Sequence, residues 1–358
     1  MIKFFRRFFF AFNIIAAIFL IGAYLSVLIS PAEAWMFSLL GLAYPLILIV
    51  NVLFALFWLF QLKVQALLSI SVIAIGSSFF NQSFQFRKDV QNAESDIKLV
   101  SYNAGLFGYF QSQWNMKELA NQVVDLEPNI LCVQEFLNLK NGDRSTMDSM
   151  KNLCGFKYAY FQSLKDGRKK GDYGMAIFSQ YEILETALVH FDGLTGNMCF
   201  YADLKMDSGV QRVYNVHLQS FKFKKQDYKF VKQLPEDNDE KIKQSKGLLK
   251  RMKSAYLKRS EQVEKIREHM QESKVPYFVM GDFNDPPVSY SYSKLSKGLK
   301  DAFVENGFGM GRTYIGMMPN FRIDYILYPK AFEGSFYKTI KLSSDHSLVA
   351  SGLKYKKE

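Results

Sequence analysis

Residues 279–287 read VMGDFNDPP, an apolar run that gives way at Gly281 to two acids and an amide before a pair of prolines. The run Tyr277–Met280 has the length and composition of a buried strand. A second polar group, SSDHS at 343–347, directly precedes the strand-like run Leu348–Leu353. Charged groups beside buried strands are costly unless they are paired or bind a metal ion. These two stretches therefore indicate a functional site at one edge of a sheet.

The same pattern recurs along the chain from residue 97 onward. Short runs rich in β-branched and aromatic residues predict further strands at Ile97–Tyr102, Ile130–Val133, Met175–Phe178, Arg212–Val216 and Ile323–Leu327. Polar residues lie at or near the ends of these runs, namely Asn103, Glu135, His217 and Asp324. Such a cluster offers carboxylates, amides and imidazoles without thiolates. It suits Mg²⁺ or Mn²⁺ better than zinc.

Two stretches predict helices. Met116–Leu126 follows Asn115, a candidate N-cap, and stops before Pro128. Ile242–Glu272 carries apolar residues at spacings of three, four and seven, which is typical of a helix with one buried face. Strands interrupted only occasionally by helices predict sheets covered by helices.

The ordered motifs resemble the endonuclease/exonuclease/phosphatase superfamily, which has the DNase I-like fold. They are, in order, VSYNAG (100–105), CVQEF (132–136), YNVHLQS (214–220), VMGDFNDPP (279–287), FRIDYIL (321–327) and SSDHS (343–347). The resemblance covers about residue 97 to the C-terminus. It implies an α/β domain, a two-sheet β-sandwich flanked by helices, that hydrolyses phosphate esters with a divalent metal ion.

The resemblance also implies catalytic roles. Asp282 would orient and deprotonate the attacking water, while Asn284 and His217 would hold phosphate oxygens. His346 would stabilise the developing negative charge, with Asp324 fixing its tautomer. A cation and an imidazolium are suited to this task because phosphoryl transfer accumulates negative charge on oxygen.

The metal ligands implied by the resemblance are Glu135, helped by Asn103 and Asp345. Mg²⁺ in proteins keeps several waters and takes only one or two carboxylates, which Glu135 and Asp345 would supply. Mn²⁺ has similar ligand preferences. The sequence therefore predicts Mg²⁺ or Mn²⁺ as the cofactor.

We predict a membrane-anchored phosphoesterase acting on nucleic acid or on a phospholipid head group, by phosphodiester or phosphomonoester hydrolysis. The alternative is a binding module on the same fold that has lost activity, which should have lost at least one motif residue. The inositol phosphatase branch is disfavoured, because FRID (321–324) stands where that branch usually carries a Pro-Ala-Trp-Cys-Asp-Arg-like signature. Tyr290, Tyr292 and Tyr314 either line the pocket or pack in the core.

The first quarter of the chain has a different composition. Among 358 residues with a net charge of +11, residues 1–88 hold six basic residues and one acid. Three uncharged runs, Phe8–Ile29, Trp35–Phe60 and Val64–Phe80, are candidate membrane spans, the last being the shortest. A cleaved signal peptide is disfavoured, because the 22 residues of the first run exceed the usual h-region of about 7–15. We expect residues 8–80 to contact lipid.

The predicted organisation is a membrane block at 1–88, a linker at 89–96 and the hydrolase domain at 97–358. Positive charge favours the cytoplasmic side of a membrane. The N-terminus, with Lys3, Arg6 and Arg7, and the turn that carries Lys63 are therefore expected in the cytoplasm. Three spans then place the domain outside the inner (cytoplasmic) membrane. If the third run does not span, the domain faces the cytoplasm.

A basic segment follows the His217 motif. Lys222–Arg259 contains 13 basic and five acidic residues. It could steer a polyanion, lie on anionic lipid heads, or be the solvated face of a helix. The three cysteines, an odd number without a C-x-x-C pair, predict neither a disulfide framework nor a zinc site of cysteines.

Overall fold

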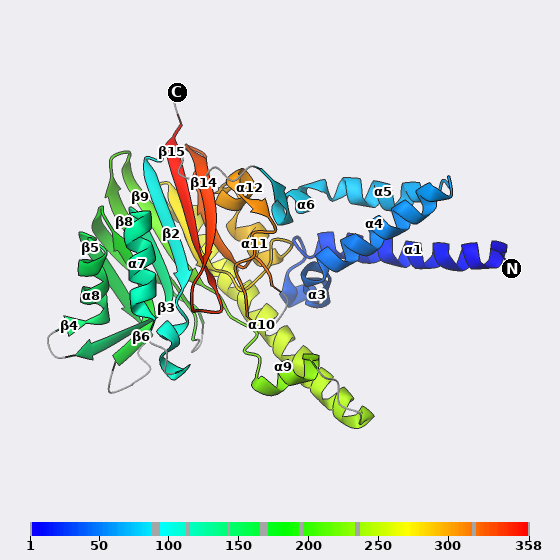
Figure 1. The fold of residues 1–358 in the computed structure, drawn as a ribbon, viewed down its shortest axis with the longest axis horizontal. Helices are drawn as coiled ribbons and strands as arrows, with labels where there is room; N and C mark the ends of the chain where they lie inside the picture. Colours follow the sequence, from blue (N-terminus) through cyan, green and yellow to red (C-terminus); the bar gives the residue numbers. More distant parts are fainter. Residues whose placement is uncertain are drawn as a thin grey trace.

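The computed structural model describes residues 2–87, 94–111, 115–141, 144–164, 171–192, 196–232, 237–316 and 320–356. It consists of a two-sheet domain and a helical block that projects from one side of it (Figure 1). The predicted linker, 89–96, lies mostly outside the described residues. Asp96 already belongs to the domain, because its backbone N–H donates to the Leu353 carbonyl.

The first sheet has the strand order β14-β15-β2-β3-β6-β5, with the short β4 paired to β3. β2 and β3 are parallel, and the other pairs are antiparallel. The strands are β2 (Ile97–Asn103), β3 (Ile130–Asn141), β4 (Arg144–Ser145), β5 (Tyr158–Ser163), β6 (Gly171–Ser179), β14 (Phe332–Lys341) and β15 (Ser347–Tyr355). The four strands predicted in this sheet are confirmed, and β4, β5 and β14 are additional.

The second sheet has the strand order β11-β13-β10-β9-β8-β7. Its central strands β9 and β10 are parallel, and the other pairs are antiparallel. The strands are β7 (Glu182–Val189), β8 (Met198–Met206), β9 (Gly209–His217), β10 (Tyr277–Asp282), β11 (Lys300–Asp301) and β13 (Asp324–Tyr328). The three strands predicted here are confirmed, and β7 and β8 were not predicted.

Both faces of each sheet are buried. Leu99 of β2 and Phe278 of β10 meet in the layer between the sheets, and both side chains are inaccessible to solvent. Their chain neighbours Val100 and Val279 point the opposite way, under the covering helices. A strand covered on both faces needs consecutive apolar residues, which is why Tyr277–Met280 is a continuous run rather than an alternating one.

Helices cover the outer faces of the sandwich. α7 (Met116–Leu126) and α8 (Thr146–Leu153) lie on the first sheet, and α10 (Asn238–Glu272) and α11 (Tyr290–Leu295) lie on the second (Figure 1). α9 (Lys225–Lys232) contacts α10, and α12 (Ala302–Asn306) contacts β13 and β14. The bounds predicted for α7 are confirmed. α10 begins four residues earlier than predicted, because the Asp237 carboxylate caps it.

The N-terminal block comprises α1 (Ile2–Leu25), α2 (Pro31–Ala34), α3 (Met36–Leu42), α4 (Tyr44–Phe60), α5 (Ala66–Ile75) and α6 (Ser77–Ser83). Within the described residues, only Phe4–Leu25 is a single helix long and apolar enough to cross a membrane. The other two predicted spans are not straight helices: α3 and α4 are bent by 66°, and α5 and α6 by 63°. The bends fall at Ala43, just before Pro45, and at Gly76. If each bent pair counts as one segment, up to three segments of the described block are long and apolar enough to cross a membrane.

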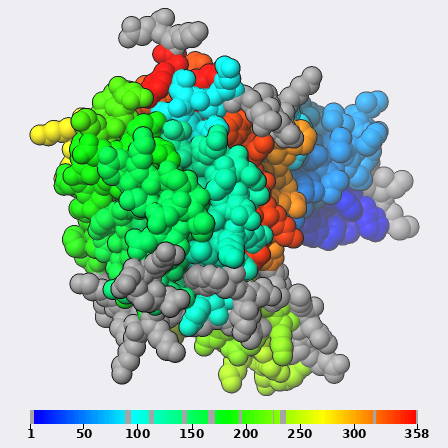
Figure 2. Space-filling model, turned by 60° about the vertical axis from the view of Figure 1, so that its left-hand side comes forward, coloured from blue at the N-terminus to red at the C-terminus, as the bar shows by residue number. Residues whose placement is uncertain are grey.

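Several polar side chains are buried inside the N-terminal block beside an apolar cluster that includes Leu20 and Val72, and many large apolar side chains are exposed. Asn13 donates to Ser69 Oγ at 2.6 Å, Trp58 Nε1 donates to Asn13 Oδ1 at 3.0 Å, and Asn51 donates to the Ala16 carbonyl at 2.9 Å. Large apolar side chains such as Phe8, Ile18 and Leu53 are exposed. This arrangement matches helices that pack through polar contacts within a lipid bilayer. Figure 2 shows the block, in blue, as a lobe beside the domain.

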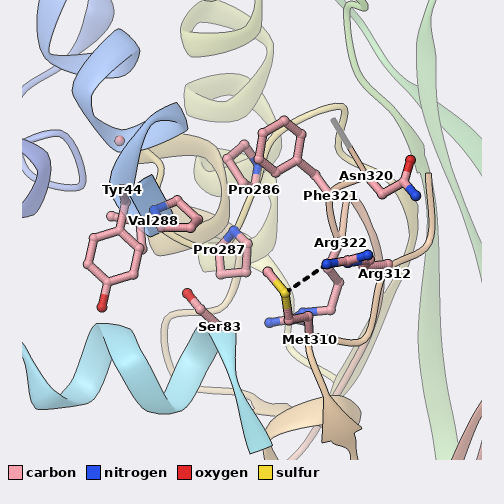
Figure 3. Close-up of a pocket in the computed structure, with 12 residues that line it drawn as sticks. Tyr44, Ser83, Pro286, Pro287, Val288, Met310, Arg312, Asn320, Phe321 and Arg322 are labelled. Atoms are coloured by element: carbon pink, nitrogen blue, oxygen red, sulfur yellow. Dashed lines mark hydrogen bonds between the residues drawn. The ribbon is translucent and has the colours of Figure 1, made fainter. Parts of the chain in front are cut away.

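The N-terminal block is docked on the domain through several segments. β1 (Gln85–Phe86) pairs with β12 (Phe308–Gly309), so residues predicted to end the membrane block already join the domain. Arg322 Nη2 donates to the Gln82 carbonyl at 2.7 Å. Figure 3 shows Tyr44 of α4 beside Pro287 and Val288, in the loop that follows β10.

Candidate functional site

The two sheets bring their polar strand ends together at one edge of the sandwich. Asn103 ends β2, and its amide donates to Asp282 Oδ2, at the end of β10, over 3.0 Å. Asp282 stands beside His217 in the parallel register and beside Asp324 in the antiparallel one. Seven of the eight predicted residues line one cavity of about 460 Å³, namely Asn103, Glu135, His217, Asp282, Asn284, Asp345 and His346. Asp324 lies behind His346.

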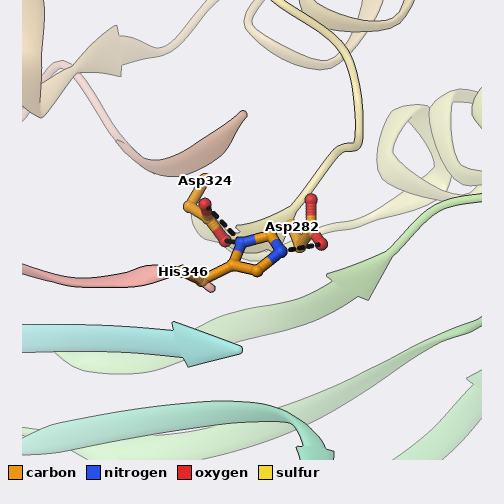
Figure 4. Close-up of side chains that lie close together, drawn as sticks. All are labelled: Asp282, Asp324 and His346. Carbon is orange, nitrogen blue, oxygen red and sulfur yellow. Dashed lines mark hydrogen bonds and ion pairs between the residues drawn. The ribbon is translucent and has the colours of Figure 1, made fainter. Parts of the chain in front are cut away.

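A carboxylate, an imidazole and a second carboxylate form a line at the base of this cavity (Figure 4). His346 Nδ1 is 3.0 Å from Asp324 Oδ2 and 3.2 Å from Oδ1. His346 Nε2 lies 3.7 Å from Asp282 Oδ2. His217 Nε2 is also 3.7 Å from Asp282 Oδ2, and 3.7 Å from Glu135 Oε1. Because Nδ1 faces Asp324, Nε2 is the nitrogen that His346 presents toward the cavity.

The surroundings shift the ionisation of these groups in different directions. Burial alone would lower the pKa of His346, but the charges of Asp324 and Asp282 raise it to about 10. Burial and the charge of Asp324 raise the pKa of Asp282, the two imidazoles oppose that rise, and the net pKa is about 6. Burial lowers the pKa of His217. At neutral pH the site thus holds an imidazolium at His346, a neutral His217 and an ionised Asp282.

Unusual backbone conformations position two of the side chains, those of Glu135 and of Asp282, which follows Gly281. β3 carries a bulge between Val133 and Phe136, and within it Glu135 has φ 47°. A bulge redirects a side chain, which here places Glu135 in the cavity wall. Gly281 has φ 136°, and a Cβ there would collide with the Val216 carbonyl of β9, so only glycine fits.

Asn284 serves as a support for Asp282 in this structure. It has φ 52°, and its backbone N–H donates to Asp282 Oδ1 at 2.8 Å. Its side-chain amide donates to the Leu218 carbonyl at 2.9 Å and to Asp282 Oδ2 at 3.2 Å. Both amide hydrogens are therefore engaged. Direct contact with a phosphate oxygen, as predicted for Asn284, would require one of these bonds to be exchanged.

The donor set fits a hard divalent cation. Glu135 and Asp345 bring two carboxylates to the cavity beside the Asn103 amide, and the Glu135 side chain is 34% exposed. Burial raises the pKa of Glu135, and the charge of Asp345, which repels the Glu135 carboxylate, adds to that rise; the charge of His346 and the hydrogen bond with Asn103 oppose it. A cation would relieve this repulsion. Asp282, Asp324 and His346 also lie within 4.8 Å of one another, but they are already paired with each other and with Asn103.

Several supporting residues were not predicted. Thr313 Oγ1 accepts from the backbone N–H groups of Ile323 and Asp324 at 2.9 and 3.0 Å, which fixes Asp324. Ser344 Oγ donates to the Asn103 carbonyl at 2.9 Å and ties the SSDHS loop to β2. Asn215 accepts from Gln134 Nε2 at 2.8 Å across the buried layer. The only sequence signal for the last pair was polar residues inside otherwise apolar strands.

One interpretation from the sequence needs correction, and the structure decides one that was left open. Arg259, counted in the basic segment, is 1% exposed and holds the loop after β10, because its Nη1 donates to the carbonyls of Gln219 and Asn284 at 3.0 and 2.5 Å. Tyr314 lines the cavity, whereas Tyr290 and Tyr292 are buried on α11 and do not. Tyr290 and Tyr292 are buried because α11 covers the second sheet.

Two family models match the chain. The endonuclease/exonuclease/phosphatase family matches residues 112–346, and a family described as a domain of unknown function (DUF8431) matches residues 6–83. A search of curated proteins gave no match.

Solved structures show the same DNase I-like fold. An endonuclease/exonuclease/phosphatase from Beutenbergia cavernae has a TM-score of 0.52 at 16% identity, with 73% of this chain and 72% of that one covered. A family protein from Leptotrichia buccalis has a TM-score of 0.52 at 15% identity, with 72% and 100% covered. The human Nocturnin catalytic domain, which was solved with a bound sulfate anion, has a TM-score of 0.51 at 17% identity, with 75% and 97% covered.

Proposed function

The chain belongs to the endonuclease/exonuclease/phosphatase family, and on this premise we propose that it is a divalent-metal-dependent hydrolase of phosphate esters, anchored to a membrane by its N-terminal block. The observation that carries the proposal is the line of Asp324, His346 and Asp282 at the base of a cavity that Glu135 and Asp345 also line. A base, a fixed cation and metal-binding oxygens in one cavity are what phosphoester hydrolysis requires.

Asp282 is the proposed general base. A pKa of about 6 leaves it ionised at neutral pH yet close enough to the working pH to accept a proton efficiently. The water oxygen bonds to phosphorus as its proton passes to Asp282, and the bond between phosphorus and the ester oxygen breaks. The leaving oxygen takes up a proton, so that one water is added across the ester. Asn103 and Asn284 hold the carboxylate in place for this step.

His346 is the proposed stabiliser of the phosphate charge. Its Nδ1 is committed to Asp324, so the Nε2–H of the imidazolium is free to donate to a phosphate oxygen. The raised pKa keeps it charged throughout the neutral range. His217, neutral at this pH, offers a second imidazole on the other side of Asp282.

Glu135, Asn103 and Asp345 are the proposed ligands of Mg²⁺ or Mn²⁺. Such an ion, when bound, supplies positive charge that stabilises phosphate oxygens and lowers the pKa of a coordinated water. Glu135 is held toward the cavity by its bulge, and Asp345 by the bond from Ser344 to Asn103. These residues hold their oxygens in position independently of the substrate.

The N-terminal block is proposed to anchor the enzyme with its domain outside the cytoplasmic membrane. The start of α1 and the turn between α4 and α5 lie at the end of the block far from the domain (Figure 1). That end carries Arg6, Arg7 and Lys63, and positive charge favours the cytoplasmic side. The domain, at the opposite end, would then face outward.

The test is hydrolysis by the full chain in detergent or nanodiscs of a bis-aryl phosphate, an aryl monophosphate, single-stranded DNA and RNA. Each reaction is run with Mg²⁺, with Mn²⁺ and with EDTA. Turnover that EDTA abolishes and either metal restores supports the proposal. A folded protein that binds Mg²⁺ but turns over none of these esters, and no lipid ester, would instead favour the catalytically silent binding module.

A further inference from the structure

The cavity that holds the site is closed on one side by the N-terminal block. Leu39 and Leu42 of α3, Ala43, and Leu46 of α4 line the same cavity as Asp282 and His346. None of these four side chains has a polar atom to offer a substrate. The wall facing the catalytic groups is therefore apolar and belongs to the part of the chain that carries the membrane-spanning helix.

This wall is fixed against the domain. Gly41 packs so closely on the Val288 carbonyl that a Cβ there would collide with it. Ser26 Oγ donates to the same carbonyl at 3.4 Å, and Tyr256 of α10 donates to the Ser38 carbonyl at 3.3 Å. Val288 itself belongs to the apolar cluster of the block. The apolar wall is thus a built part of the cavity.

The domain contributes matching apolar groups beside the block. Phe221, Phe223 and Phe321 line the cavity and are half-buried. Phe221 and Phe223 are stacked with their ring centroids 5.1 Å apart, and Arg259 lies under Phe221, 4.7 Å from its centroid. Lys222, exposed between them, brings one positive charge to the rim. The cavity is thus polar at the strand ends and apolar toward the block.

A cavity that is polar at one end and apolar at the other fits an amphiphilic substrate. A nucleotide chain or a sugar phosphate would place polar groups against Leu39, Leu42 and Leu46. Binding such a substrate would therefore gain no free energy from burying these apolar side chains. A hydrocarbon chain would cover these leucines. It could extend from them along the exposed apolar surface of α4, where Ile49 and Leu53 face outward. Leu46 is 69% exposed, so the cavity opens at the side where the block meets its surroundings.

We infer that the substrate is a phosphate ester of a membrane lipid, with its phosphate at Asp282 and His346 and its hydrocarbon on the wall formed by residues 39–46. This inference rests on the proposed function. The hydrolysis step is the one described above. A water oxygen bonds to phosphorus and gives one proton to Asp282, the bond from phosphorus to one ester oxygen breaks, and that oxygen takes up the proton from Asp282 and leaves as a hydroxyl group. The lipid enters from the bilayer that holds the N-terminal block.

The test compares esters with the same head and different tails. Full-length protein in nanodiscs is given phosphatidylglycerol or phosphatidate, and separately their deacylated, water-soluble counterparts. We expect kcat/KM for the lipids to exceed that for the soluble esters at least tenfold. Leu46→Gln should lower the lipid-to-soluble ratio about tenfold, the scale at which apolar pockets discriminate.

The chain offers a matched control. Leu28 is 71% exposed, belongs to the same block and does not line the cavity, so Leu28→Gln should leave the ratio unchanged. Equal use of both tail types, a better rate on single-stranded nucleic acid, or an equal effect of the two substitutions would overturn the lipid assignment while leaving phosphoester hydrolysis in place.

A second readout separates the lipid assignment from catalysis. Phosphatidate and diacylglycerol with a photoactivatable group in the acyl chain are bound to the metal-free protein in EDTA. We expect phosphatidate, and not diacylglycerol, to label Phe221 and Phe223, which belong to the domain. If the protein hydrolyses no ester, the proposed function is wrong. The labelling experiment then still shows whether the cavity binds a lipid phosphate. Equal labelling by both probes would overturn the inference.

Discussion

Asn103 and Asp282 join the two sheets at the site: the Asn103 amide, at the end of β2, donates to the Asp282 carboxylate, at the end of β10, over 3.0 Å. Each sheet has one parallel pair near its centre, β2 with β3 and β9 with β10. Parallel neighbours end on the same side, so both pairs deliver their last residues to one edge. The bond shows that the edges of the two sheets coincide there.

Asp324→Asn should shift the alkaline limb of the pH–rate profile. The Asp324 carboxylate helps to raise the pKa of His346 from its ordinary value of 6.5 to about 10. Wild-type kcat/KM should therefore fall only as the pH rises toward 10. In Asp324→Asn the pKa of His346 loses the contribution of that carboxylate, so the fall should begin at lower pH.

The pairing of His346 with Asp324 should also make the stability of the protein depend on pH. A raised histidine pKa contributes stability that is fully present below about 6.5 and is lost as the pH rises through about 10. This loss should be smaller in Asp324→Asn, as followed by Tm against pH. Asp207→Asn, at an exposed turn, is the control. An alkaline limb unchanged by Asp324→Asn would remove His346 from its proposed role.

Glu135→Gln should weaken metal binding. The substitution keeps the size of the side chain but replaces a charged ligand oxygen with an amide. We expect the dissociation constant for Mg²⁺, measured by titration calorimetry, to rise roughly tenfold or more. Glu261→Gln, on the exposed face of α10, should bind Mg²⁺ like the wild type. Unaltered Mg²⁺ affinity in Glu135→Gln would exclude Glu135 as a ligand.

Arg259→Met should destabilise the domain. Arg259 Nη2 is 3.2 Å from Asp285 Oδ1, an ion pair whose angle does not make a hydrogen bond, and both side chains are buried. Removing the arginine leaves a buried carboxylate without its partner, which costs about 3–5 kcal/mol of unfolding free energy. Arg259→Met combined with Asp285→Asn should recover part of this loss. Equal stability of the single and double variants would show that the pair is not coupled.

The orientation of the chain can be read from two engineered cysteines. In a Cys154→Ser background, Ser208→Cys lies in an exposed turn of the domain and Lys63→Cys in the turn between α4 and α5. A maleimide that cannot cross membranes should label residue 208 in intact spheroplasts and residue 63 only after lysis. The reverse pattern would place the domain in the cytoplasm.

The sequence was sufficient to predict which polar residues the fold brings together, because these residues lie at strand ends in short ordered motifs. It was also sufficient for strands buried on both faces, whose apolar runs are continuous. β7 and β14 escaped prediction because they are edge strands with one open side, and they carry charges such as Glu185 and Lys338. β8 contains Asp203, which is neutralised by Arg212 of the next strand at 2.7 Å, a pairing that no local pattern reveals.

The wall contributed by the N-terminal block could not be predicted at all. Leu42 and Asp282 line one cavity although 240 positions separate them in the sequence. The apolar run around Leu42 is accounted for by membrane insertion alone, so nothing in it indicates a second role. Hydropathy does not register the bends at Ala43 and Gly76 either, because it records only the length and composition of an apolar run.

The most direct test of the central claim is the Mg²⁺-dependent turnover of Asp282→Asn against the wild type on the ester that the wild type hydrolyses best. The variant cannot accept the water proton, so kcat should fall roughly 10²–10⁴-fold. Its Tm should fall only modestly: the neutral amide removes a buried charge, but it places an NH₂ group against a donor, because both carboxylate oxygens accept hydrogen bonds from Asn103 or Asn284. Wild-type turnover by a folded Asp282→Asn protein would contradict the account.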